Sequence, residues 1–135
     1  MNVQQKGLIA LIKSALDKCA YTLPEDFSVG LAAKEALRHK IVGLAYYGAV
    51  YCGVDKKLEP MQGLFRYLIP TMNATEKQYF TVTKVCEAFE ENGIFYMPVK
   101  GAVLQAYYPS RELRTMGDAD ILIRMEQYDR IKPIM

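Results

Sequence analysis

The sequence predicts an α+β fold, with a helical region over residues 1–92 followed by a strand–helix–strand unit over residues 93–135. Three observations lead to this prediction. Apolar residues recur at helical spacing through the first region, as the stripe within Val3–Cys19 illustrates. The second region contains two short apolar runs, 94–99 and 119–124, with the length and bounding residues of strands. The total of 135 residues suits one domain, or one domain and part of another.

Helix start, stop and breaking signals within the first region predict three helices. The first covers Val3–Cys19, and Pro24 marks the break after it. A second helix is expected from about Ser28 to Tyr51. A third is expected from about Pro60 to Asn92, with Pro70 as a kink or a break. The residues expected on its buried side are Phe80, Val82, Val85 and Phe89.

The second region predicts a strand over Ile94–Val99, in which Pro98 indicates a sheet edge or the strand end. A short helix is expected over Ala102–Tyr108. A polar loop then leads to the second strand, Ala119–Arg124, and a last helix starts at Glu126. We therefore divide the chain into a helical region and the start of an α/β unit.

Charge is nearly balanced, with 17 Lys and Arg against 15 Asp and Glu, which argues against a nucleic-acid coat or a polybasic membrane patch. The N-terminus lacks the basic and apolar stretches of a signal peptide, and the most apolar stretch, 41–54, is too short to span a bilayer. Three cysteines without close pairs predict reduced thiols. We expect a cytoplasmic protein with no membrane partner.

The strongest candidates for chemistry are Asp118 and Asp120. Residues i and i+2 of a strand point to the same face, so the two carboxylates converge there. They repel each other unless a cation lies between them, and their oxygen atoms suit Mg²⁺ or Mn²⁺, which keep positions open for substrate phosphates. Gly117 lets the backbone bend sharply beside a ligand. A turn with solvated charges is the alternative, because Asp-x-Asp is common.

Basic and small residues nearby favour a phosphate-binding interpretation. Lys100 and Gly101 follow the first predicted strand and open a helix, where free N–H groups and a positive charge attract phosphate. A plain strand-to-helix turn is the alternative. Arg114 lies four residues before Asp118, placed to contact a triphosphate or to brace the carboxylates. The alternative for Arg114 is a solvated loop arginine.

The order strand, glycine-started helix, loop and Gly-Asp-x-Asp resembles the polymerase-β-like nucleotidyltransferase superfamily. More narrowly, it resembles a bacterial family of nucleotidyltransferases that is largely uncharacterised. The match covers about residues 94 to 124. The segments that carry it are Pro98-Val-Lys-Gly-Ala102, Tyr108-Pro109, Leu113-Arg114 and Met116-Gly-Asp-Ala-Asp-Ile-Leu-Ile123. The implied fold is the first strand–helix–strand part of a nucleotidyltransferase-like mixed sheet.

The resemblance implies transfer of a nucleoside monophosphate from an NTP to an acceptor, with release of pyrophosphate. Asp118 and Asp120 would hold the metals, and Gly101 would line the triphosphate pocket. Lys100 and Arg114 would contact phosphates. The acceptor stays open among a protein hydroxyl, a small molecule and an RNA end, and the balanced charge favours the first two over long nucleic acid.

The sequence departs from the superfamily pattern in two places, and these departures keep alternative functions open. Gly101-Ala102 stands where Gly-Ser or Gly-Gly is common. The third carboxylate, which usually comes from a later strand, is not found after Ile123, because Asp129 falls in a predicted helix. We therefore expect a truncated chain whose domain is completed by self-association or by a partner subunit.

Three other functions remain open at this stage. The first is a catalytically incomplete nucleotidyltransferase-like binding or regulatory module. The second is a glycosyltransferase, although there the aliphatic run usually precedes Asp-x-Asp, whereas residues 121–123 follow it here. The third is a purely helical interaction protein, which leaves the pattern over residues 94–124 unexplained.

Overall fold

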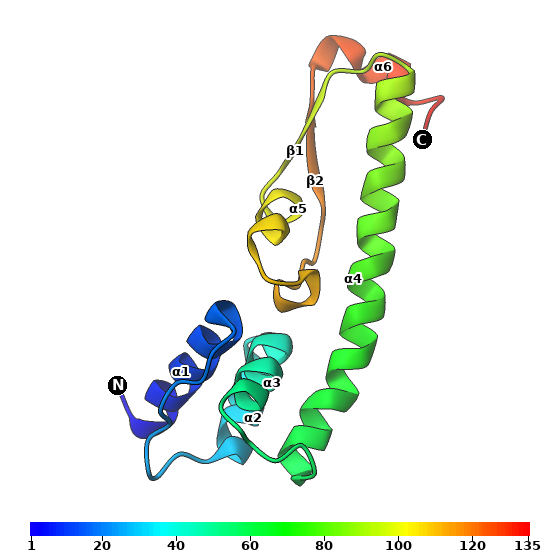
Figure 1. Ribbon diagram of the computed structural model, residues 1–135. Coiled ribbons are helices and arrows are strands. Elements are labelled where there is room, and N and C mark those ends of the chain that lie inside the picture. The colour runs from blue at the N-terminus through cyan, green and yellow to red at the C-terminus, as the bar shows by residue number, and fades with distance from the viewer.

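The computed structural model describes residues 1–135. Three helices form a cluster at one end, and a long fourth helix leads from this cluster to a two-stranded sheet at the other end (Figure 1). The elements are α1 (Val3–Asp17), α2 (Val29–Arg38), α3 (Val42–Tyr51), α4 (Glu59–Glu91), β1 (Tyr96–Val99), α5 (Gly101–Leu104), η1 (Gln105–Tyr107), η2 (Arg111–Leu113), β2 (Asp120–Ile123), η3 (Met125–Gln127) and α6 (Tyr128–Ile131). The α+β prediction is confirmed.

Helix α1 has clear start and stop signals. Asn2 and Gln5 form a capping box, in which each side chain accepts a hydrogen bond from the other residue's backbone N–H. The helix ends at Lys18, which adopts a left-handed conformation. Its buried residues, including Leu11 and Ala15, face α3. The first predicted helix is therefore present and ends two residues early.

The prediction of one helix from Ser28 to Tyr51 is wrong. The chain leaves the helix at His39, takes a positive φ of 56° at Lys40, and starts α3 at Val42. The break lets α3 pack along α1 while α2 packs against α4, and both helices bury small residues in one core. No glycine or proline marks the break, so the sequence carries no local signal for it.

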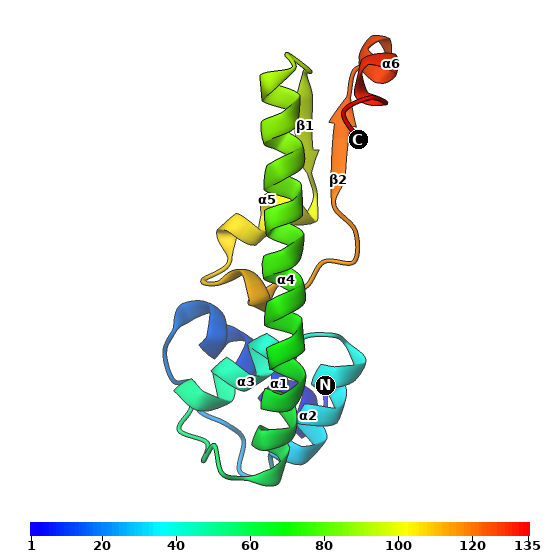
Figure 2. The same ribbon diagram turned by 90° about the vertical axis from the view of Figure 1, so that its right-hand side faces the viewer.

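Helix α4 runs without interruption through Pro70, so proline neither ends it nor splits it. Proline lacks the N–H that would bond to the carbonyl of Arg66, and this part of the helix faces solvent. The neighbouring Thr71 hydroxyl donates to the carbonyl of Tyr67 at 2.9 Å. Figure 2 shows α4 passing the helical cluster and then the sheet.

The expected burial of Phe80 is also wrong, because its ring is 62% exposed. The side of α4 that faces the sheet is set by Val82, Val85 and Phe89, which are three and four residues apart. Two residues before Val82, a helix has turned about 200° away from that stripe. The ring of Phe80 instead lies beside the ammonium of Lys84.

Strands β1 and β2 pair antiparallel, so each opposite pair shares a face of the sheet. One face, which includes Tyr96 and Ile121, packs on α4 with Phe89. The other face carries Met97 and Leu122, each 54% exposed. The register is Tyr96↔Ile123, Met97↔Leu122, Pro98↔Ile121 and Val99↔Asp120. Asp120 therefore lies on the face that points away from α4.

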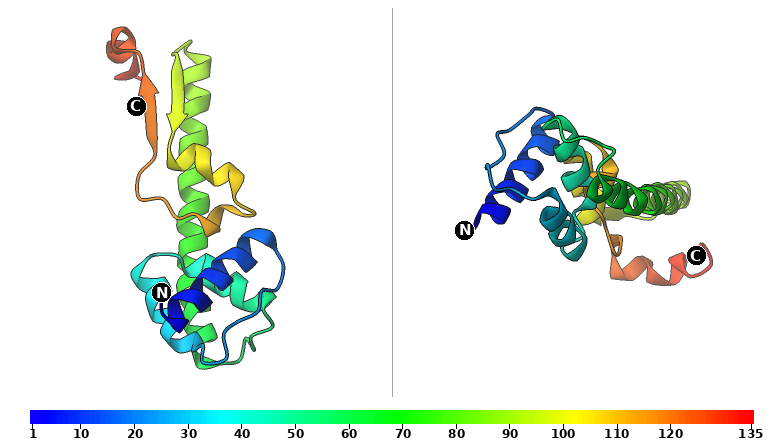
Figure 3. Two further views of the ribbon diagram at one scale, coloured as in Figure 1. Left: turned by 90° about the vertical axis from the view of Figure 1, so that its left-hand side faces the viewer. Right: turned by 90° about the horizontal axis from the view of Figure 1, so that it is seen from below.

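The long helix takes part in two cores. Near its start, Met61, Leu64 and Leu68 are buried in the helical cluster. Near its end, Phe89 is buried with Ile94 and with residues of β2 and α6. The left view of Figure 3 shows the strands beside the far half of α4, away from α1. No helix is both long enough and apolar enough to cross a bilayer.

Candidate functional site

Lys100 and Asp120 come together where β1 ends and β2 begins. The register places Val99 opposite Asp120, so Lys100, the residue after Val99, lies beside the Asp120 carboxylate. The Lys100 Nζ atom is 3.0 Å from Asp120 Oδ2. The two side chains are 75% and 46% exposed, so the ion pair is open to solvent and contributes little to stability.

The backbone of Lys100 is strained. Its φ and ψ angles are 53° and −118°, a region that glycine occupies and other residues rarely do. Such a conformation costs about 1–3 kcal/mol and concentrates at functional sites. A lysine in this strained conformation is therefore a stronger candidate for function than a lysine in ordinary extended backbone.

Gly101, the first residue of α5, is buried under the loop that carries the acidic pair. A Cβ atom on Gly101 would lie 2.5 Å from Met116 Sδ, so the loop packs directly on the glycine. Gly117 has no atom within 4 Å of the place where its Cβ would be. Gly101 therefore marks a contact between the helix start and the loop, whereas Gly117 lies beside open space.

Three side chains that the sequence did not single out hold this loop. The buried Gln105 donates from Nε2 to the carbonyl of Arg114 at 2.9 Å. Gln78 of α4 donates to the carbonyl of Gly117 at 3.2 Å. The Thr115 hydroxyl donates to the carbonyl of Lys40 at 3.1 Å. The loop is thereby tied to α5–η1, to α4 and to the break between α2 and α3.

Helix η2 adds a second attachment to the helical cluster. The Arg111 guanidinium lies 3.1 Å from both carboxylate oxygens of Glu76 and 3.6 Å from the centre of the Tyr79 ring. The Tyr47 hydroxyl donates to Glu112 at 3.2 Å. Burial, and then the charge of Glu112, raise the pKa of Tyr47 above its usual value.

Arg114 and Asp118 take no part in the ion pair. The Arg114 guanidinium is 6.0 Å from the centre of the Tyr108 ring, and its buried Nε atom has no hydrogen-bond partner. Asp118 lies just before β2 rather than within it, is exposed, and makes no hydrogen bond or ion pair. Of the six candidate residues, the structure joins Lys100 to Asp120 directly and packs Gly101 under the loop.

The Asp120 carboxylate has one positive charge beside it. The ammonium of Lys100 occupies that place, which demonstrates that the carboxylate is accessible and that a positive charge fits there. Carboxylate oxygens are suitable ligands for Mg²⁺ or Mn²⁺. No group of three or more His, Cys, Asp or Glu side chains comes together in the chain. A metal held here would therefore rely on Asp118 and Asp120 without a third such side chain beside them.

The strain at Lys100 leads to a prediction about stability. The free energy of unfolding of Lys100→Gly is expected to be about 1 kcal/mol higher than that of Lys100→Ala. Glycine tolerates φ of 53° and alanine does not. Both variants lose the same ion pair, so the comparison isolates the backbone. Urea unfolding followed by circular dichroism measures the difference, and equal stabilities of the two variants would contradict it.

The comparison with family models gives one result. A model described as an uncharacterised nucleotidyltransferase matches residues 25–135. This match confirms the resemblance that the motifs within residues 94–124 indicate, and it also takes in helices α2, α3 and α4. No curated protein and no solved structure matches the chain.

Proposed function

The chain belongs to the family of uncharacterised nucleotidyltransferases, and from that premise we propose that it transfers a nucleoside monophosphate from an NTP to the hydroxyl of an acceptor. The observation that carries the proposal is the contact between Lys100 and Asp120 at 3.0 Å. It brings together the cation that would bind phosphate and a carboxylate that would bind the metal in this proposal.

In this proposal Lys100 binds the triphosphate. Helix α5 has only four residues, so its dipole is small and the lysine charge supplies most of the attraction. The exposed side chain of Lys100 can exchange the carboxylate for a phosphate without unfolding anything. Gly101 contributes by allowing the loop at Met116 to pack closely, which keeps the lysine and the acids in one place.

Asp118 and Asp120 would hold the divalent ion. When bound, that ion would neutralise charge on the triphosphate and on the leaving pyrophosphate. Release of Asp120 from Lys100 frees its oxygen atoms for this role, and Asp118 is already exposed and unpaired. The two events are complementary, because the lysine moves toward phosphate as the carboxylate gains its ion.

The reaction balances without a further reactant. The acceptor oxygen forms a bond to the α-phosphorus of the NTP, and the bond from that phosphorus to the oxygen bridging to the β-phosphate breaks. Pyrophosphate leaves with the electron pair, and the hydroxyl proton passes to solvent. Lys100 stabilises the negative charge that moves onto the pyrophosphate, in the way that positioned cations lower phosphoryl-transfer barriers.

One observation favours a second candidate, a nucleotidyltransferase-like binding or regulatory module. The same ion pair neutralises Asp120 without a metal, and a module that never performs transfer could keep it permanently. In such a module Lys100 would stay on Asp120, so nucleotide binding would not depend on a divalent ion. Metal dependence therefore separates the two candidates.

Calorimetric titration with each of the four NTPs, in Mg²⁺ and in EDTA, tests the proposal. We expect at least one NTP to bind about tenfold more tightly in Mg²⁺, a difference of about 1.4 kcal/mol. Equal affinity in the two buffers would favour the regulatory module. Failure of every NTP to bind would contradict both candidates.

A further inference from the structure

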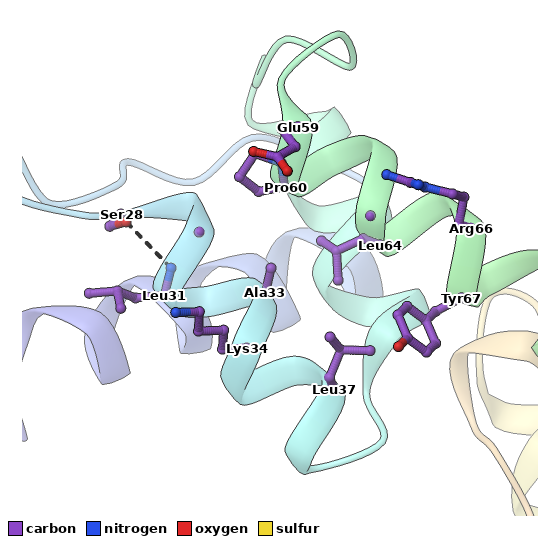
Figure 4. Close-up of a pocket in the computed structure, with 12 residues that line it drawn as sticks. Ser28, Leu31, Ala33, Lys34, Leu37, Glu59, Pro60, Leu64, Arg66 and Tyr67 are labelled. Carbon is purple, nitrogen blue, oxygen red and sulfur yellow. Dashed lines mark hydrogen bonds between the residues drawn. The ribbon is translucent and has the colours of Figure 1, made fainter.

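A groove separates α2 from the first half of α4 (Figure 4). Its volume is about 490 Å³, and its floor includes Ala33, Leu37 and Leu64. A second hollow of about 370 Å³ shares Leu37 and Tyr67 with the first and continues to Thr115. The two together form one track, which starts at the beginning of α2 and ends at the loop that carries the acidic pair.

The rim of this track is positively charged. Lys34 and Arg66 line its first part, and Lys40 lines the second. None of the three makes a salt bridge, although five other Lys or Arg side chains pair with carboxylates elsewhere in the chain. Glu59 is the only acidic residue among the lining residues of both parts. Arg66 donates from Nε to the carbonyl of Gln62, and none of the three cations has a carboxylate partner. Three such cations beside an apolar floor favour a ligand that carries both carboxylates and aliphatic groups.

We infer that this track binds an acidic peptide segment of a partner protein. Leucine-like side chains of the peptide pack on the floor at Leu37, and its carboxylates pair with Lys34 and Arg66. Tyr67, which is 58% exposed where the two parts meet, offers a ring for one further apolar contact. Extended peptides present alternating side chains, so one strand of sequence satisfies the floor and the rim together.

The lining favours a peptide over single-stranded nucleic acid. Nucleic-acid tracks combine cations with several aromatic side chains on which successive bases stack. Here the floor is aliphatic and Tyr67 is the one aromatic residue that lines it. The inference does not depend on nucleotide chemistry, because none of the lining residues belongs to the acidic pair or to Lys100.

Fluorescence anisotropy with a fluorescein-labelled peptide of alternating Leu and Glu tests the inference. The wild-type chain is expected to bind this probe more tightly than a matched peptide of alternating Leu and Lys. The double variant Lys34→Glu with Arg66→Glu is expected to raise Kd about tenfold or more, because two exposed attractive pairs become repulsive. The milder Lys34→Gln with Arg66→Gln should lie between this variant and wild type.

The matched control is Lys6→Glu with Lys13→Glu, which places the same charge change on exposed positions of α1. It should leave Kd within about twofold of wild type, since these charges lie outside the groove. Equal weakening by the control, or no binding of the Leu–Glu peptide, would overturn the inference. Tighter binding of a labelled oligo(dT) at the same residues would overturn it in favour of nucleic acid. Replacement of both Asp118 and Asp120 should leave peptide binding unchanged, which keeps this test separate from the proposed nucleotide site.

Discussion

Replacing Asp118 and Asp120 together by Asn is expected to abolish the Mg²⁺-dependent part of NTP binding. The amide oxygens keep the shape of the side chains but remove the two charges that attract the ion. We expect Kd in Mg²⁺ to rise about tenfold, or about 1.4 kcal/mol, to the value measured in EDTA. Calorimetric titration of the NTP that binds wild type most tightly measures the change.

The matched control for this prediction is Asp129→Asn with Glu126→Gln, which removes the same charge from exposed residues of the same region. The control should bind NTP as wild type does in both buffers. Unchanged Mg²⁺-dependent binding in the Asp118 and Asp120 variant would show that the ion is held elsewhere. Equal losses in both variants would reduce the effect to a general change of charge.

Gly48→Ala is expected to lower the free energy of unfolding by about 3 kcal/mol or more. A Cβ atom on Gly48 would lie 2.0 Å from the carbonyl oxygen of Leu11 and 2.9 Å from its Cα. These are backbone atoms, so no side-chain rotation relieves the clash and α1 must move away from α3. Because α1 and α3 share the most extensive helix contact of the chain, the whole cluster should loosen.

Gly63→Ala provides the control, since Gly63 also lies inside a helix but has no atom within 4 Å of its Cβ position. Here the methyl group meets nothing, and alanine favours the helix by about 0.5–1 kcal/mol over glycine. In urea unfolding, the free energy of unfolding should therefore fall for Gly48→Ala and rise for Gly63→Ala. A small or absent loss in Gly48→Ala would contradict the close approach of α1 and α3.

Several elements followed directly from local patterns in the sequence. The α1 stripe, the strand pair and the small helix after Lys100 all appear within a few residues of their predicted bounds. Each depends on neighbouring residues alone, through periodicity, caps or short apolar runs. The break at Lys40 and the exposure of Phe80 depend instead on how α3 and α4 pack. This packing cannot be predicted from the residues of one segment alone.

The sequence motif proposed residues for the candidate site but could not give their geometry. The motif singled out Lys100 and Asp120, whereas their contact follows from the strand register, which pairs Val99 with Asp120. The loop anchors carry no motif at all. Thr115 bonds to the carbonyl of Lys40, 75 positions away in the sequence, so only the folded chain identifies it.

The most direct test of the central claim is electron paramagnetic resonance of Mn²⁺ titrated into the chain with a non-hydrolysable NTP analogue. Mn²⁺ prefers the same oxygen ligands as Mg²⁺, and the signal of the free ion falls as it binds. We expect the analogue and the wild-type chain together to take up Mn²⁺ beyond what the analogue alone binds, and the Asp118→Asn with Asp120→Asn variant to add nothing. Equal uptake by wild type and variant would contradict a metal site on these two carboxylates.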